Sequence, residues 1–346
     1  MRPLPDSPFD RPGPRIWRLQ RSYQGNRPRN AASLPSLPPD VVGYRRLMEA
    51  DEAGTLKARR KGCQSRSSPR IGGHSMTSSH YAHGTDAAEQ QRLTVMNRLL
   101  NDRCLAAARL RTGDRVVDFG AGLGQFSRAM ARATGVKVVG IERSEEQIRG
   151  AMSQASSEQE AHLLEMRQGE VEAPPIEGAE WGTFDVAHAR FLLEHLRDPL
   201  ITVQNMVRAV RPGGRIILAD DDCEALRLWP EPPALAPVWR AYQRAYDRHG
   251  NDPSIGRRLV QLLHQAGAAP KSNTFVFFGS CSGEPDFENY VLNIGSEIAQ
   301  STDDIVETGV SREMVERAIA ELGTWRKAPD SAIWYGIFWA EGVKQG

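Results

Sequence analysis

Cysteine is scarce in this sequence of 346 residues, and the four cysteines, Cys63, Cys104, Cys223 and Cys281, lie far apart. No C-x-x-C pair occurs, so the sequence indicates neither a zinc site nor a disulfide framework, and no bound metal is expected. This cysteine usage fits a reducing compartment, and we expect a cytoplasmic protein.

Long apolar runs are also missing. No stretch approaches the ~18 consecutive apolar residues of a membrane span, and the N-terminus lacks the continuous apolar segment of a signal peptide. The sequence therefore predicts a protein with no membrane span.

Charge is unevenly distributed although the net charge is only +1. Residues 1–75 hold 15 Lys and Arg against 6 Asp and Glu, and 10 of the 22 prolines. Such a segment buries too little apolar surface to offset its ordering entropy, so we predict a disordered basic tail over 1–75. It is either an arm for an anionic partner or a consequence of start-site choice. Residues 76–346 hold 29 basic against 37 acidic residues, so we expect a folded domain there that binds no nucleic acid.

A glycine turn organises the folded part. Residues 115–119 have the composition of a short buried strand, three glycines follow at alternate positions (Gly120, Gly122, Gly124), and a helix is predicted from Phe126. A strand, a glycine turn and a helix N-terminus form a binding site for a ligand with an anionic group. A dinucleotide-binding fingerprint would need its third glycine at position 125, where the sequence has Gln125.

The turn has the pattern D-x-G-x-G-x-G from Asp118, which resembles the first motif of class I S-adenosylmethionine-dependent methyltransferases. That resemblance implies that Asp118 and the turn, with Ala121, face the methionine end of the cofactor. Tyr81-Ala82-His83-Gly84 resembles the helical entry segment of small-molecule methyltransferases. There Tyr81 is expected to fold over the same end, the alternative being an ordinary amphipathic helix.

Acidic residues follow the next two predicted strands. Glu142 ends the strand over 136–141 and stands 18 residues after Gly124, which suits hydrogen bonds to a ribose diol. Arg143 either lies against adenine or is simply exposed. Glu170 and Val171 occupy places where this family often has Asp-Ala, so the resemblance implies contacts to adenine, although glutamate is one methylene longer.

The fourth predicted strand, Phe184–Arg190, is followed by Phe191-Leu-Leu-Glu-His195-Leu-Arg-Asp-Pro199. This run resembles the fourth motif of ubiquinone-biosynthesis-type methyltransferases, a small-molecule group that also includes the type 11 and type 25-like enzymes. Ala189 lies at the strand end that would border the ligand. His195 is a candidate for direct chemistry, the alternative being a packing residue. No Asn-Pro-Pro-Tyr follows the strand, so DNA bases and glutamine amides are disfavoured as acceptors.

The fifth predicted strand ends in Asp220-Asp221-Asp222. Asp222 is the candidate for holding a cationic acceptor or removing its proton, the alternative being a solvated acidic turn. Beyond it we predict helical cap segments over about 229–272 and 285–330, a sixth strand over 274–279 between them, and a final strand over 331–339. Four aromatic residues are candidates for the acceptor pocket: Tyr290, Trp325, Trp334 and Trp339.

The predicted fold is α/β, a Rossmann-like sheet of seven mostly parallel strands with helices on both faces and a helical cap. Ligands of open α/β sheets bind outside the carboxyl ends of the strands, and Gly120, Glu142, Glu170 and Ala189 all lie there. The site residues therefore converge on one edge of the sheet.

The resemblance implies methyl transfer from S-adenosylmethionine to a small-molecule acceptor by direct displacement, leaving S-adenosylhomocysteine. The acceptor atom (O, N or C), the need for a general base, and the choice between monomer and homodimer stay open. A nicotinamide-dependent oxidoreductase would share the fold and Glu142. A non-catalytic S-adenosylmethionine-binding regulator would keep the cofactor motifs without an acceptor pocket.

Overall fold

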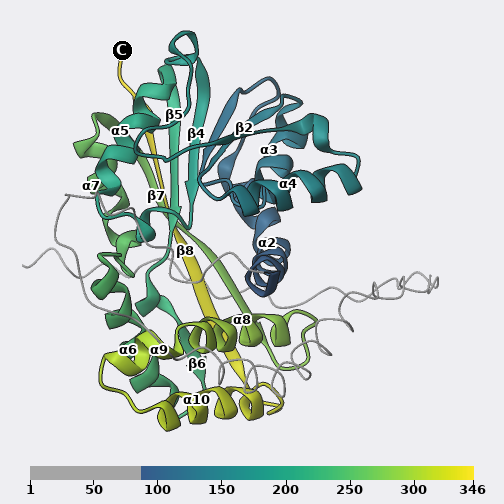
Figure 1. Ribbon diagram of the computed structural model, residues 1–346, viewed down its shortest axis with the longest axis vertical. Coiled ribbons are helices and arrows are strands. Elements are labelled where there is room, and N and C mark those ends of the chain that lie inside the picture. The colour runs from purple at the N-terminus through teal and green to yellow at the C-terminus, as the bar shows by residue number, and fades with distance from the viewer. Residues whose placement is uncertain (1–86) are drawn as a thin grey trace, which may run out of the picture. The chain divides into compact units, whose positions relative to one another are not determined.

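A computed structural model describes residues 87–346, except the side chains of residues 87, 88 and 247–249. In this range one mixed sheet carries helices on its two faces (Figure 1). The strands are β1 Val116–Phe119, β2 Val138–Glu142, β3 Leu164–Gln168, β4 Phe184–Arg190, β5 Val210–Asp220, β6 Arg227–Trp229, β7 Ala268–Cys281 and β8 Ala332–Lys344. The helices are α2 Ala87–Ala108, α3 Gln125–Thr134, α4 Glu145–Ser157, α5 Pro199–Ala209, α6 Leu235–His249, α7 Leu259–Gln265, α8 Phe287–Gln300, α9 Thr302–Glu307 and α10 Arg312–Trp325.

The first five strands form the parallel part of the sheet, in the order β3-β2-β1-β4-β5. All residues of β1 and β2 are buried, as expected for parallel strands covered on both faces. Successive residues of β1 face opposite sides of the sheet. Val116 packs in the hydrophobic cluster that contains α2 and α3 residues, and Val117 packs in the cluster that contains α5 and α7 residues. The strand carboxyl ends therefore meet at one edge, as the sequence predicts.

The sheet has eight strands rather than the seven predicted. The additional strand is β6, at residues where the sequence predicts no strand. One edge of β8 pairs with β7 over the full length of both strands. The other edge pairs antiparallel with β5 through residues 338–343 and with β6 through residues 332–334. Both β7 and β8 are longer than predicted, so their ribbon continues past the end of β5.

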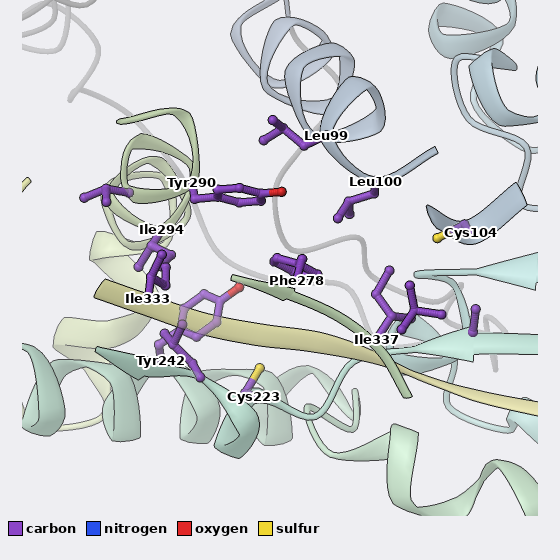
Figure 2. Packing of buried hydrophobic residues seen from close by; sticks show 14 of the residues in the cluster. Leu99, Leu100, Cys104, Cys223, Tyr242, Phe278, Tyr290, Ile294, Ile333 and Ile337 are labelled. Atoms are coloured by element: carbon purple, nitrogen blue, oxygen red, sulfur yellow. The ribbon is translucent and has the colours of Figure 1, made fainter. Parts of the chain in front are cut away.

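Helices α6, α8, α9 and α10 gather around this extended part of the ribbon, in the lower half of Figure 1. Buried side chains join them to α2 and to both long strands, and Figure 2 shows Tyr242, Phe278, Tyr290 and Ile333 in this cluster. These helices lie within the segments predicted as a cap. No helix in residues 87–346 combines the length and the apolar character that a bilayer crossing requires.

Candidate active site

The glycine turn after β1 is closed by backbone hydrogen bonds to the neighbouring strand. The N–H groups of Gly120 and Ala121 both donate to the carbonyl of Ile141, at 2.9 and 3.0 Å. Gly120 and Gly124 have φ values of 70° and 64°, a region that favours glycine. A Cβ at Gly124 would lie 2.5 Å from Cδ2 of Leu164. The turn therefore depends on glycine both for its backbone conformation and for space.

Glu142, at the carboxyl end of β2, connects this turn to α4. Its Oε2 accepts a hydrogen bond from the N–H of Gly122 at 3.1 Å, and its Oε1 accepts one from Ser144 at 2.9 Å. Burial raises the pKa of the carboxyl, and the two backbone N–H groups oppose that rise. A carboxylate oxygen has more than one acceptor position, so Glu142 can still accept hydrogen bonds from a ligand.

A cavity lies over the carboxyl ends of β1, β2, β3 and β4 and continues beneath α2 and α6. Most of the sequence-predicted site residues line it: Asp118, Gly120, Ala121, Gly122, Glu142, Arg143, Glu170, Val171 and His195. The loop that carries Glu170 and Val171 is held by Asn205, whose Nδ2 donates to the carbonyls of Val171 and Glu172 at 3.1 and 2.9 Å. The structure therefore brings the predicted adenine, ribose and methionine contacts to one cavity.

Three predicted residues are not among those that line the cavity, and each has a structural reason. Gly124 ends the turn and begins α3, packed against Leu164. The side chain of Ala189 is buried in the hydrophobic cluster on the α5 and α7 face. The carboxylate of Asp222 forms an ion pair with Arg257. Tyr81 lies outside the described residues, so its role stays a prediction.

The far part of the cavity is a polar compartment that the sequence did not reveal, and we call it the acidic chamber. It is lined by residues from η4 (Leu193–His195), from the segment after β5, and from α6, α8 and β8. Its polar residues are Glu194, His195, Asp221, Cys223, Trp239, Tyr242, Tyr246, Glu297 and Tyr335.

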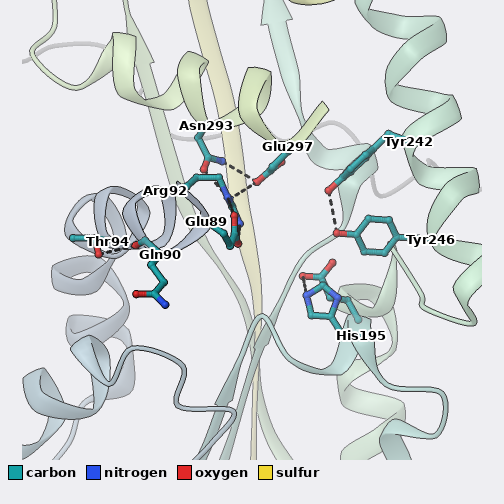
Figure 3. A network of polar contacts seen from close by, with 10 residues as sticks. Glu89, Gln90, Arg92, Thr94, His195, Tyr242, Tyr246, Asn293 and Glu297 are labelled. Atoms are coloured by element: carbon teal, nitrogen blue, oxygen red, sulfur yellow. Dashed lines mark hydrogen bonds and ion pairs between the residues drawn. The ribbon is translucent and has the colours of Figure 1, made fainter. Parts of the chain in front are cut away.

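Figure 3 shows some of the polar contacts in and beside this chamber. Arg92 on α2 donates to Glu297 at 2.9 Å and to Glu89 at 2.7 Å. The hydroxyls of Tyr242 and Tyr246 lie 3.0 Å apart. Arg92 is thus shared between two carboxylates, and the chamber holds more acidic than basic groups among the described residues.

Burial governs the protonation of these carboxyls. It raises the pKa of Glu194 and of Asp221 well above the usual range, and the neighbouring Asp220 adds to both shifts. Burial also raises the pKa of Glu297, against the opposing charge of Arg92. Burial therefore favours the protonated, neutral form of these carboxyls, which can both donate and accept hydrogen bonds.

His195 lines the acidic chamber. Its ring stacks on Tyr246 with centroids 6.0 Å apart, and its Nε2 lies 3.6 Å from Oε1 of Glu194. The side chain is 7% exposed, so a ligand that reaches it is shielded from bulk water.

The aromatic residues predicted for the acceptor pocket lie elsewhere. Tyr290 stacks on Phe278 and accepts a hydrogen bond from Arg103 at 2.9 Å, and Trp325 packs against Phe287. Trp334 is 41% exposed, and Trp339 is fully buried in the sheet. The cavity is lined instead by Trp239, Tyr242, Tyr246 and Tyr335.

Comparison with known proteins supports the same reading of the fold. Residues 88–272 match the family described as "Methyltransferase domain". The chain is 33% identical over 138 residues to the 27-O-demethylrifamycin SV methyltransferase of Amycolatopsis mediterranei, covering 40% of this chain and 50% of that protein. It is 27% identical over 188 residues to O-methyltransferase resE of Aspergillus sclerotiorum, covering 54% and 67%.

A solved putative methyltransferase from Bacillus halodurans C-125 superposes with a TM-score of 0.48 at 15% identity, covering 71% of this chain and 99% of that one. The chain spans about half to two thirds of the length of the first curated relatives it matches.

The glycine turn after β1, the carboxylate after β2 and the cavity over the strand ends define a class I S-adenosylmethionine-dependent methyltransferase fold. The chain belongs to the Methyltransferase domain family. This membership decides against the nicotinamide-dependent alternative, as Gln125 already indicated.

Proposed function

We propose that the protein transfers the methyl group of S-adenosylmethionine to a hydroxyl oxygen of a small-molecule acceptor. The observation that carries the proposal is the continuity of one cavity from the glycine turn and Glu142 to the acidic chamber. A cofactor bound over the strand ends would present its sulfonium methyl toward that chamber. Oxygen is favoured because one of the two relatives named above is an O-methyltransferase by name, and the other is named for a 27-O-demethyl substrate.

The cofactor supplies the electrophile, so the protein mainly positions two reactants and excludes water. In the proposed pose, Glu142 accepts hydrogen bonds from the ribose diol, and Glu170 with Val171 binds adenine. The glycine turn faces the atoms beyond the ribose. Arg143, which also lines the cavity, lies against the adenine.

His195 is the proposed proton acceptor. The acceptor oxygen attacks the methyl carbon, the carbon–sulfur bond breaks, and its electron pair stays on sulfur as the thioether of S-adenosylhomocysteine. The hydroxyl proton passes to the imidazole of His195, whose Nε2 lies 3.6 Å from Oε1 of Glu194. Asp222, paired with Arg257, takes no part.

The test is transfer of labelled methyl from S-adenosylmethionine into a metabolite extract, followed by mass identification of the product. His195→Ala should lower kcat by about 100- to 10,000-fold, the usual contribution of general acid–base catalysis, with S-adenosylhomocysteine affinity unchanged. His264→Ala, on α7 outside the cavity, is the matched control. A parent protein that binds S-adenosylhomocysteine but methylates nothing would instead be a non-catalytic binding protein.

A further inference from the structure

Arg190, the last residue of β4, is held in a fixed position at the wall of the cavity. Its Nη2 donates to the side-chain oxygens of Asn97 and Asn101, the latter at 3.0 Å, and both asparagines belong to α2. The guanidinium carbon lies 4.3 Å from the centroid of the Phe126 ring. These contacts orient the side chain without neutralising its charge.

No carboxylate in the described part of the chain pairs with Arg190, and its buried Nη1 has no hydrogen-bond partner there. A buried N–H group without an acceptor destabilises the folded state, more so when it carries charge. Guanidinium groups match the geometry of carboxylates. Arg190 is therefore a cation whose Nη1 can donate hydrogen bonds to an anionic ligand.

His188, two residues earlier on the same face of β4, provides a second and independent observation. Its side chain is 1% exposed, and its Nδ1 lies 2.7 Å from Oδ1 of Asp118. The other oxygen of Asp118 accepts a hydrogen bond from Ser127 at 2.5 Å. The Nε2 of His188 is buried and has no partner among residues 87–346, although the side chain lines the cavity.

The order of the strands indicates which part of a ligand reaches these two side chains. Glu170 follows β3, Glu142 ends β2, the glycine turn follows β1, and β4 comes next in the sheet. If adenine and ribose lie at β3 and β2, the amino-acid moiety of the cofactor lies at β1 and β4. That moiety carries one carboxylate and one ammonium.

We propose that Arg190 binds the carboxylate of the amino-acid moiety of S-adenosylmethionine through Nη1, and that Nε2 of His188 accepts a hydrogen bond from its ammonium. This inference rests on the cofactor pose of the proposed function. In the tautomer that donates Nδ1–H to Asp118, Nε2 carries the lone pair that an ammonium requires. Arg190 and His188 thus make the site specific for amino-acid-bearing adenosine thioethers.

The test compares S-adenosylhomocysteine with 5′-methylthioadenosine, which has the same adenosine and thioether but neither the carboxylate nor the ammonium. Calorimetry on the full chain should show that Arg190→Met weakens S-adenosylhomocysteine on the order of 10- to 100-fold, the effect of losing a hydrogen bond to a charged group. Binding of 5′-methylthioadenosine should not change. Arg190→Lys, which keeps the charge without the planar fork, should lose less. Arg240→Ala, exposed on α6, is the control.

Each other outcome has a distinct meaning. Equal weakening of both ligands by Arg190→Met, or no weakening of either, overturns the inference, because Arg190 would then be structural or idle. Equal affinity of the parent protein for the two ligands also overturns it but leaves the proposed function intact. A parent protein that binds neither ligand overturns the proposed function as well. The melting temperature of each variant shows whether it is folded.

Discussion

The carboxylate of Asp222 is held on both sides by the guanidinium of Arg257, with Oδ2 2.5 Å from Nε and Oδ1 2.9 Å from Nη2. Oδ1 also accepts a hydrogen bond from the N–H of Glu224 at 3.0 Å, which caps the short turn Cys223–Ala225. The side chain of Asp222 therefore stabilises the segment after β5. The preceding residue, Asp221, faces the cavity.

Asp222→Ala should accordingly be a stability variant. Loss of the cap should lower the free energy of unfolding by about 1–2 kcal/mol, with kcat and cofactor affinity little changed. Arg257 is 47% exposed, so Arg257→Ala should cost less, about 1 kcal/mol at most. Urea unfolding and steady-state kinetics measure both. A large fall in kcat at unchanged stability would show instead that Asp222 takes part in catalysis.

Glu142→Ala should weaken S-adenosylmethionine and S-adenosylhomocysteine by about 10- to 100-fold, because two ribose hydroxyls lose a charged acceptor. The parent protein should prefer adenosine over 2′,3′-dideoxyadenosine, and the variant should lose that preference. Glu145→Ala, exposed on α4, is the control. Retention of the preference in Glu142→Ala would mean that the carboxylate only positions the N–H groups of Gly122 and Ser144.

Tyr246→Phe should alter the kcat or KM for the acceptor while the affinity for S-adenosylhomocysteine stays constant, because the hydroxyl lies in the acidic chamber. Tyr290→Phe removes a hydroxyl bonded to Arg103 outside the cavity and should affect stability alone. Equal effects of the two substitutions on acceptor kinetics would contradict this placement of the acceptor.

Asp220 should make stability depend on pH. Burial raises its pKa from the usual 3.8 to about 7 in the folded chain. The unfolded chain therefore releases this proton at lower pH, so the contribution to stability is present at about pH 4 and is lost as the pH rises to about 7. Asn does not titrate, so Asp220→Asn should show a smaller fall in unfolding free energy across that interval. This holds even if the substitution changes the unfolding free energy by a constant amount at every pH.

Urea unfolding at several pH values measures this slope, and Asp198→Asn, at an exposed position, is the control. Parallel pH profiles for Asp220→Asn and the parent protein would show that the pKa of Asp220 does not differ between the folded and unfolded states.

A truncated chain that begins at Met76 should keep the melting temperature and the affinity for S-adenosylhomocysteine. The reason is compositional: residues 1–75 have too few apolar side chains to pack stably. Differential scanning calorimetry and ligand titration compare the two chains. A lower melting temperature or weaker binding would show that residues 1–75 contact the domain.

The positions of the glycine turn and of Glu142 were predictable because their signals are local. The three glycines and Glu142 lie within a few residues of their own strands. The acidic chamber gave no such signal: Glu194, Tyr246, Glu297 and Tyr335 come from four elements far apart in the chain. These side chains come together only when the cap segments pack on the sheet. The hydrophobic periodicity of each segment does not predict that packing.

Two further features of the cavity were not predicted from the sequence. In the irregular segment after β5, no strand alternation decides whether Asp221 or Asp222 faces the cavity, and Asp222 is fixed by an arginine 35 residues away. His188 and Arg190 alternate with alanines on a buried strand beside Asp118. Two polar residues on one face of such a strand were the available signal for the binding site that we propose there.

The position of β8 has a consequence for biosynthesis. Strands β5, β6 and β7 all precede β8 in the chain, yet each needs it as a partner. In a nascent chain, β5, β6 and β7 cannot form these pairs until residues 332–344 have left the ribosome. The acidic chamber, which includes a residue of β8, therefore forms late. Until then the unpaired edge of β5 is open to pairing with other chains, so this interval is when a chaperone would protect the protein most.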